Sequence, residues 1–227
     1  MTPIAVLARL TAPLSFITRR RVAAQLFQFA LAEQESMLEL RAAAARTPSA
    51  ERRALYLRHA LDEERHATAF ARHAGEIRRS LGLPAWGHPR TGSEALFERL
   101  GEPAFLAFVH RGEHKGRCQF EAYASFFAGR GDAKLRALFV AIVADERRHE
   151  SYTRELLLAC AGGERAARAL LAKVTLREAL RAWRRAGQAV AERVYGAAML
   201  VVYVTLLPFA IALRAARPDA GGRWRER

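Results

Sequence analysis

The pentapeptide DEERH at residues 62–66 recurs as DERRH at residues 145–149, so both copies read D-E-x-R-H. In each copy a glutamate and a histidine are three residues apart, which places their side chains on the same side of a helix. One such pair is common on a solvated helix face, but two copies on separate helices rarely arise by chance. The repeat therefore indicates one site to which two helices contribute the same pair of side chains.

The chain around these motifs is rich in Ala, Leu, Arg and Glu, and its apolar residues recur every three or four positions. This period predicts helices, and no alternating β-branched runs interrupt it. Clusters of turn-forming residues separate four long helices, and Ser49 is placed to cap the second. We expect these helices at about residues 20–45, 50–80, 103–128 and 133–160.

The lengths of the connections predict the topology. Short turns join the first helix to the second and the third to the fourth, whereas a long crossover containing Pro and Gly separates the two pairs. Two antiparallel hairpins joined in this way form the ferritin-like variant of the four-helix bundle. The sequence therefore predicts an all-α fold, with a ferritin-like bundle at residues 20–162 and a basic, apolar helical extension at residues 163–227.

A di-metal site in such a bundle needs one further carboxylate from each of the other two helices. Residues at one level of an antiparallel pair lie equally far from the turn, and the turn near residue 48 places Glu63 level with about residue 33. Glu33 lies on an apolar helix face, so we choose it over Glu35. The face of Glu35 carries a more surface-like set of residues, namely Gln28, Leu31 and Glu39.

The same count assigns the ligand of the third helix. The turn near residue 130 places Glu146 level with about residue 114, and Glu113 fits that position. Glu121 lies too close to the turn, and we assign it to the surface or to a pocket wall. The predicted set of ligands is therefore Glu33, Glu63, His66, Glu113, Glu146 and His149.

Four carboxylates in a bundle core would be costly or would have to bind protons unless cations accompanied them. Two divalent cations remove that cost, and a carboxylate–imidazole set without thiolates suits iron or manganese. The aspartate of each motif is placed to accept the free ring N–H of the opposite histidine. Asp62 would then orient His149 and Asp145 would orient His66, and the alternative for either aspartate is a solvated helix residue.

The two D-E-x-R-H motifs resemble the signature of the ferritin-like diiron-carboxylate enzymes. Residues 131–135 and 144–153 are similar to the matching hairpin of soluble acyl-carrier-protein desaturases. Glu33-Gln34-Glu35 and the overall size look more like aldehyde-deformylating oxygenases, in which the first glutamate of the run is a ligand. The resemblance covers about residues 25–160 and leaves out the apolar C-terminal region.

The resemblance implies an O₂-dependent diiron oxidase or oxygenase of the desaturase or hydroxylase type. Two iron ions, or manganese, would be held by the six predicted ligands, with O₂ as co-substrate. An external electron-donor protein is implied as well, because the chain has no flavin motif and no Cys cluster for an iron–sulfur centre. The alternative function is iron oxidation or peroxide scavenging, as in rubrerythrin-like and ferritin-like proteins.

The remaining histidines are weaker evidence for a functional site. His59 and His73 lie seven residues on either side of His66, and we expect them to line a bundle seam or the surface. His110 and His114 flank Glu113, so either is a candidate donor to the ligands. Cys118 is expected to be a small core residue.

Residues 194–213 contain no charged side chain, and 20 helical residues span about 30 Å, the thickness of a bilayer's hydrocarbon core. We expect a membrane anchor here, with a buried fifth helix as the alternative. Basic residues on both flanks give no orientation. The segment favours a hydrophobic, lipid-like substrate and a location in the cytoplasm or at the cytoplasmic face of the inner membrane. Residues 1–18 do not resemble a secretory signal, because their charges follow the apolar stretch.

The composition excludes several classes of protein. The 227 residues include 37 Lys and Arg against 23 Asp and Glu, which gives a net charge of +14. This charge permits contact with anionic lipid or nucleic acid, but no nucleic-acid-reading motif is present, and we expect no nucleic-acid partner. Two cysteines form no disulfide framework, and no Gly-rich phosphate-binding loop occurs. A homodimer remains open.

Overall fold

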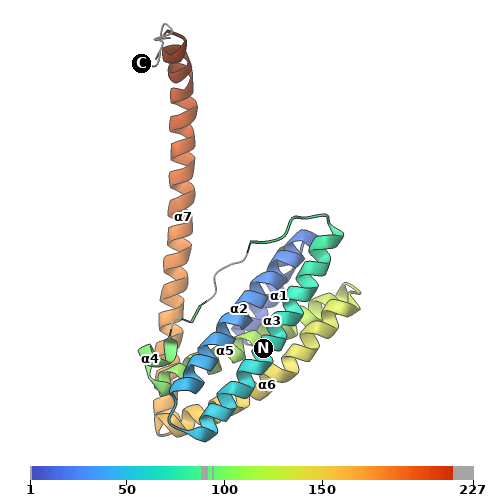
Figure 1. Ribbon diagram of the computed structural model, residues 1–227, viewed down its shortest axis with the longest axis vertical. Coiled ribbons are helices and arrows are strands. Elements are labelled where there is room, and N and C mark those ends of the chain that lie inside the picture. Colours follow the sequence, from blue (N-terminus) through green and yellow to red (C-terminus); the bar gives the residue numbers. More distant parts are fainter. Residues whose placement is uncertain (1, 88–91, 94, 217–227) are drawn as a thin grey trace, which may run out of the picture. The chain divides into compact units, whose positions relative to one another are not determined.

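The structure is a computed structural model that describes residues 2–87, 92–93 and 95–216. Within these ranges the chain forms helices and no strands, which confirms the all-α prediction (Figure 1). The chain divides into two compact units, Met1–Thr175 and Leu176–Arg227. The helices are α1 (Pro3–Ser15), α2 (Arg19–Arg46), α3 (Ala50–Ser80), α4 (Leu96–Leu100), α5 (Glu102–Gly129), α6 (Ala133–Ala161) and α7 (Glu164–Ala216).

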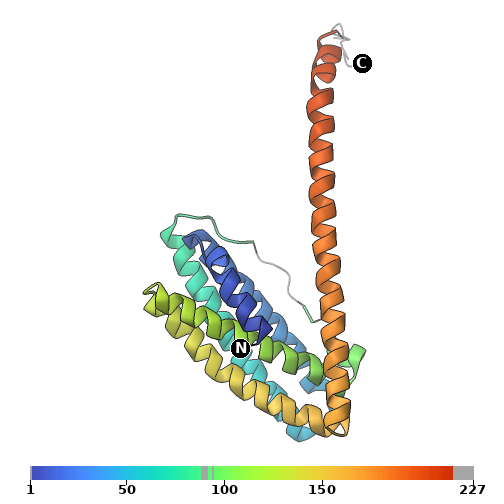
Figure 2. The same ribbon diagram turned by 180° about the vertical axis from the view of Figure 1, so that it is seen from behind.

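The four long helices of the first unit begin and end within one residue of the predicted positions. α2 packs along α3 and α5 packs along α6, so each pair forms a helical hairpin, and α3 also contacts α6. The two opposite views in Figures 1 and 2 show α2, α3, α5 and α6 lying alongside one another. The first unit continues past the predicted boundary at residue 162 to Thr175, and it also includes α1.

Local sequence explains where these helices stop and start. The Ser49 hydroxyl accepts the backbone N–H of Arg52 at 3.2 Å, which confirms the predicted N-cap of α3. Asp132 caps α6 in the same way by accepting the N–H of Leu135 at 3.0 Å. The preceding Gly131 has a φ of +70°, a conformation that glycine adopts without steric cost and that reverses the chain between α5 and α6.

The crossover between α3 and α5 packs back on the first hairpin. Trp86 stacks on Phe27 of α2, with ring centroids 4.3 Å apart. The crossover contains the short helix α4, and its first N–H, that of Leu96, donates to the carboxylate of Glu39 at 2.9 Å. Glu39 is therefore buried, and its prediction as a surface-like residue was wrong because the crossover covers that face of α2.

The N-terminal residues form a helix that the sequence did not predict. α1 packs on α5, and Phe16, which directly follows it, is fully buried against Tyr123 and Phe127 with ring centroids 5.0 Å away in each case. Ala8 and Ala12 form the buried side of α1. Its other side is apolar too and is exposed, through Val6, Leu7, Leu10 and Leu14, with Ile17 just beyond.

The core of the first unit consists of two apolar clusters with a polar layer between them. One cluster contains Leu26, Phe70, Phe120 and Phe139, and α1 and Phe16 belong to it. The other contains Leu40, Tyr56, Leu106 and Leu157. Each of the four long helices contributes to both clusters, so each passes through the polar layer between them. The buried polar residues of this layer are Glu33, His59, Asp62, Glu63, His66, Glu113, Glu146 and His149.

The second unit is the continuation of α7, which remains helical through Pro208. Residues 194–213 are exposed along their whole length except for the half-buried Met199. Among the described helices, α7 alone is long and apolar enough to cross a bilayer. The uncharged stretch is thus an apolar helix whose side chains are exposed within the second unit.

Candidate metal centre

The structure brings all six predicted ligands together in the polar layer. Glu33 comes from α2, the first D-E-x-R-H motif from α3, Glu113 from α5 and the second motif from α6. All six side chains are buried, so each helix delivers its carboxylate or imidazole to the interior. The residue counts from the two turns therefore chose the buried glutamate in both hairpins, and Glu35, which was rejected, is exposed.

These side chains form two overlapping groups that share Glu63. The Glu33 group consists of Glu33, Glu63, His66 and Glu146. The His59 group consists of His59, Glu63, Glu113 and His149. Within each group, one ligand-type atom from every residue lies within 4.8 Å of the others, a spacing compatible with a metal ion. Four buried carboxylates and three imidazoles thus surround two adjacent positions.

The two aspartates hold the histidines as the motif suggested. Oδ2 of Asp62 is 3.0 Å from Nε2 of His149, and Oδ2 of Asp145 is 3.0 Å from Nε2 of His66. If Nε2–H donates to the aspartate in each case, Nδ1 carries the lone pair and faces the carboxylates. Nδ1 of His149 is 3.4 Å from Oε2 of Glu113, and Nδ1 of His66 is 3.8 Å from Oε1 of Glu146.

Neither of these Nδ1 atoms has a hydrogen-bond partner, although both are buried. A buried polar atom left without a partner is costly, and native structures contain few of them. An imidazole that donates through one nitrogen to a carboxylate and leaves the other nitrogen free is the usual arrangement of a metal-binding histidine. The two orphaned atoms therefore fit a metal-binding role, and they point into the two groups of carboxylates.

The electrostatics of the layer also fit cation binding. Burial raises the pKa of Glu33, and burial together with the neighbouring Glu33 raises the pKa of Glu63 well above its usual range. Burial and Glu113 have the same effect on the pKa of Glu146. Glu113 differs because His59 and His149 outweigh its burial and hold its pKa below the usual range. The raised pKa values of Glu33, Glu63 and Glu146 favour their protonated forms in the absence of cations, and bound cations would displace such protons.

His59 is a member of the layer that the sequence did not predict. Its Nε2 is 2.9 Å from Oε1 of Glu63, and its Nδ1 is 2.5 Å from the hydroxyl of Tyr152 on α6. Burial lowers the pKa of His59, which favours the neutral ring. The one sequence signal was its position four residues before Glu63, which puts both side chains on the same face of α3.

The other candidates lie outside the two groups. Glu121 pairs with Arg117 at 3.2 Å and with Arg147 at 2.8 Å, in agreement with its assignment to the surface or a pocket wall. His110 and His114 were candidate donors to the ligands, but both are hydrogen-bonded to Glu150. His110 contacts the backbone carbonyl of Glu150, and His114 contacts its side-chain carboxylate. Cys118 is buried, as expected of a core residue.

A glycine leaves room for one of the carboxylates. Gly116 lies one turn after Glu113 on α5, and a Cβ atom added to it would lie 3.0 Å from Oε2 of Glu146. That separation is tighter than ordinary van der Waals contact, so any side chain at this position would press on the carboxylate. A Cβ atom added to Gly112, which lies one turn before Gly116, would have no atom within 4 Å.

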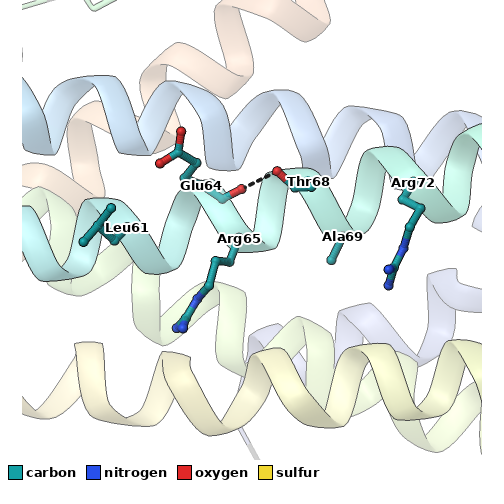
Figure 3. Close-up of a pocket in the computed structure, with 6 residues that line it drawn as sticks. All are labelled: Leu61, Glu64, Arg65, Thr68, Ala69 and Arg72. Carbon is teal, nitrogen blue, oxygen red and sulfur yellow. Dashed lines mark hydrogen bonds between the residues drawn. The ribbon is translucent and has the colours of Figure 1, made fainter.

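The side of the layer that carries the aspartates is open to solvent at α3 and α6. The exposed Arg148 pairs with Asp145 at 2.6 Å and with Asp62 at 3.5 Å, and the exposed Arg65 also pairs with both. Arg65 lines an open groove of about 630 Å³ along α3. Figure 3 shows Arg65 and Arg72 pointing from this groove toward α6, whereas Glu64 points toward α2.

Comparisons with known proteins do not assign the chain to a family. No family model, no curated protein and no solved structure matches it.

Proposed function

We propose that the first unit is a ferritin-like four-helix bundle with a dinuclear metal centre, and that the protein is an O₂-dependent diiron oxidase or oxygenase. The observation that carries this proposal is the pair of overlapping buried groups, in which Nδ1 of His66 and Nδ1 of His149 have no partner. Iron suits a carboxylate–imidazole set without thiolates, and manganese is the alternative. When bound, two iron ions would supply the redox chemistry needed to reduce O₂.

The chain's own residues would hold and shield this centre. Asp62 and Asp145 fix the imidazole rings so that Nδ1 faces the carboxylates. The apolar clusters on both sides of the polar layer exclude water along the bundle axis. Leu26, Phe70, Leu106 and Phe120 belong to these clusters and are buried. They are apolar, and we infer an apolar substrate chain in contact with them.

A hydrophobic, lipid-like substrate is also consistent with the exposed apolar surfaces. Residues 194–213 of α7 are long and apolar enough to enter a bilayer. Independently, α1 in the first unit exposes an apolar stripe, and Arg19, Arg20 and Arg21 follow it in the chain. Apolar residues next to a basic cluster favour contact with anionic lipid. We therefore place the protein at a membrane surface, where a lipid-like substrate is available.

The proposed reaction requires electrons from another protein. The aspartates that hold His66 and His149 are paired with Arg65 and Arg148, which are exposed on α3 and α6. Each imidazole is thus connected through its aspartate to exposed arginines. The proposed electron donor is a protein with an acidic surface that docks over these arginines.

The activity test uses the full-length protein loaded with iron, reduced, and exposed to O₂ in the presence of a panel of lipids. The proposal predicts that at least one lipid accelerates reoxidation and gains one oxygen atom or loses two hydrogen atoms, as measured by mass spectrometry. Hydrogen peroxide is the matched comparison. If peroxide accelerates reoxidation strongly and no lipid does, the protein is instead a peroxide scavenger of the rubrerythrin-like kind.

A further inference from the structure

We propose that His59 is a third imidazole ligand of the metal centre, that Tyr152 fixes its orientation, and that the two cation positions therefore have different ligand sets. This inference rests on the proposed dinuclear centre and deepens it. His59 lies outside the D-E-x-R-H repeat, so the repeat describes only the symmetric part of the centre.

The contacts of His59 place it among the ligands. Its buried side chain lies one helical turn before Glu63 on α3. Nε2 of His59 is 2.9 Å from Oε1 of Glu63 and 3.4 Å from Oε1 of Glu113, which belongs to the other hairpin. Its ring packs against that of His149, with centroids 3.7 Å apart. His59 therefore faces the same carboxylates as His149.

The separations within the His59 group match those around a small cation. Two ligand atoms that each lie about 2.1 Å from one cation are roughly 3.0–3.4 Å apart at adjacent coordination positions. Nδ1 of His149 is 3.4 Å from Oε2 of Glu113 and 3.5 Å from Oε1 of Glu63, and Nε2 of His59 is 3.4 Å from Oε1 of Glu113. Only the 2.9 Å separation of His59 and Glu63 is shorter, and it has the length of a hydrogen bond.

Tyr152 holds the ring of His59 by a hydrogen bond, as the aspartates hold the rings of His66 and His149. Its hydroxyl is 2.5 Å from Nδ1 of His59, on the side of the ring opposite to Nε2. With a cation on Nε2, the ring must carry its proton on Nδ1 and donate it to the Tyr152 oxygen. All three imidazoles therefore share one arrangement, in which one nitrogen is held by an oxygen and the other faces the carboxylates.

The two positions then differ in chemistry. The His59 group offers two nitrogens and two carboxylates, whereas the Glu33 group offers one nitrogen and three carboxylates. Imidazole suits the later first-row metals and carboxylate suits manganese. We therefore expect Co²⁺, a spectroscopic substitute for iron, to fill the His59 group before the Glu33 group.

The direct test counts the imidazoles bound to metal. Full-length protein in detergent micelles is freed of metal and titrated with Co²⁺. A histidine bound to high-spin Co²⁺ has a ring N–H proton whose NMR signal is strongly shifted and exchanges with solvent. We expect three such signals when two Co²⁺ are bound per chain. Two signals at the same loading would overturn the assignment of His59.

Variants identify the histidine that gives the third shifted signal and the binding step that depends on it. His59→Ala and the bulkier His59→Gln should each remove one shifted signal and weaken one binding step at least about tenfold, with the other step unchanged within about twofold. Tyr152→Phe should keep three signals but weaken the same step about 10- to 100-fold. His73→Ala is the control, because His73 is another buried histidine of α3 that belongs to neither group. It should change neither step.

The outcomes separate this inference from the function on which it rests. Wild-type protein that binds fewer than two Co²⁺ would contradict the dinuclear centre itself. Wild-type protein that binds two, with both steps unchanged in the His59 variants, would contradict only the role of His59. Equal weakening of both steps in His59→Gln would also overturn it, since that result would mean that His59 acts through Glu63, which both groups share.

Discussion

Two glutamates of α5 with the same chemistry have different surroundings. Glu113 lies in the polar layer, where His59 and His149 stabilise its charge and keep its pKa low. Glu121, about two turns further along α5, is neutralised by Arg117 and Arg147 near the solvent. Both carboxylates lie beside nitrogen-bearing side chains, but only Glu113 faces other potential ligands. This contrast makes the pair a matched test of the site.

Glu113→Ala should lower the affinity of one metal position at least about tenfold, because it removes one of the carboxylates of the His59 group. Glu121→Ala should leave both positions unchanged. Metal content after equilibrium dialysis measures both variants. Loss of binding in Glu121→Ala with normal binding in Glu113→Ala would show that the assignment by counting from the turn is wrong.

The space beside Glu146 is a second property of single residues. Gly116→Ala should weaken metal binding, because the added methyl group would approach Oε2 of Glu146 to 3.0 Å and a carboxylate held by a cation cannot move away. Gly112→Ala has open space and should leave metal binding unchanged while stabilising the helix by roughly 0.5–1 kcal/mol. Titration with metal and thermal unfolding of both variants check this difference. Equal affinities in the two variants would contradict it.

At the scale of elements, each of the four long helices of the first unit carries buried polar residues between the apolar residues of the two clusters. In α2, for example, Glu33 lies between Ala30 of one apolar cluster and Met37 of the other. Helix packing thus brings these polar residues to one level, and it also concentrates four carboxyls there. Their burial makes the stability of the bundle depend on pH and on metal.

The metal-free protein should become less stable as the pH rises above about 4.5, the ordinary pKa of glutamate. Glu33, Glu63 and Glu146 have raised pKa values, so the folded protein retains protons that the unfolded chain has released, at a cost of about 1.4 kcal/mol per proton and pH unit. Glu113 has a lowered pKa, so it stabilises the fold above about pH 4.5. This contribution is lost as the pH falls below about 4.5.

Bound metal should reverse this trend, because cations displace the protons and bind more tightly as the pH rises. Urea unfolding of the metal-free and metal-loaded protein between pH 5 and 8 measures both slopes. A metal-free protein whose free energy of unfolding increases with pH over this range would contradict the raised pKa values of these buried glutamates.

Element boundaries were predictable because they depend on neighbouring residues. Ser49, Gly131 and Asp132 act through local caps and turns, and these signals are visible in the chain itself. Contacts between distant segments were not predictable in the same way. The burial of Phe16 depends on Tyr123 and Phe127 of α5, and no local pattern in residues 1–18 reveals that pairing.

The site was predictable to the extent that it is periodic. The repeated motif and the equal distances from the turns located six residues of the layer. The spacing of seven residues could not distinguish His59 from His73, because both share the helical face of His66. His59 contacts Tyr152 and the carboxylate of Glu63, and these contacts distinguish it from His73.

At the scale of the whole molecule, the chain combines a compact unit that contains the candidate centre with a long helix whose apolar segment is exposed. Both groups of candidate ligands lie before Thr175, within the first unit. Each exposed large apolar side chain of residues 194–213 would gain roughly 1.5–3 kcal/mol on transfer to lipid. Membrane binding and metal binding should therefore be separable.

A chain that ends at Arg185 should be soluble without detergent and should bind as much metal as the full-length protein. The full-length protein should float with lipid vesicles in a density gradient. Replacement of Leu200, Val204 and Leu207 by glutamate keeps the length of α7 and should strongly reduce flotation, and any binding that remains should depend on anionic lipid because α1 and the arginines at residues 19–21 are unchanged. Full-length protein that is monomeric in buffer and does not float would contradict a membrane role for α7.

The number of metal ions per chain tests the central claim most directly. Full-length protein saturated with iron, or with manganese, and then freed of excess metal is measured by elemental analysis against protein concentration. The overlapping Glu33 and His59 groups predict two ions per chain, and simultaneous replacement of Glu63 and Glu146 by alanine should abolish that binding. Zero or one ion per wild-type chain at saturation, or two ions retained by the double variant, would contradict the dinuclear centre.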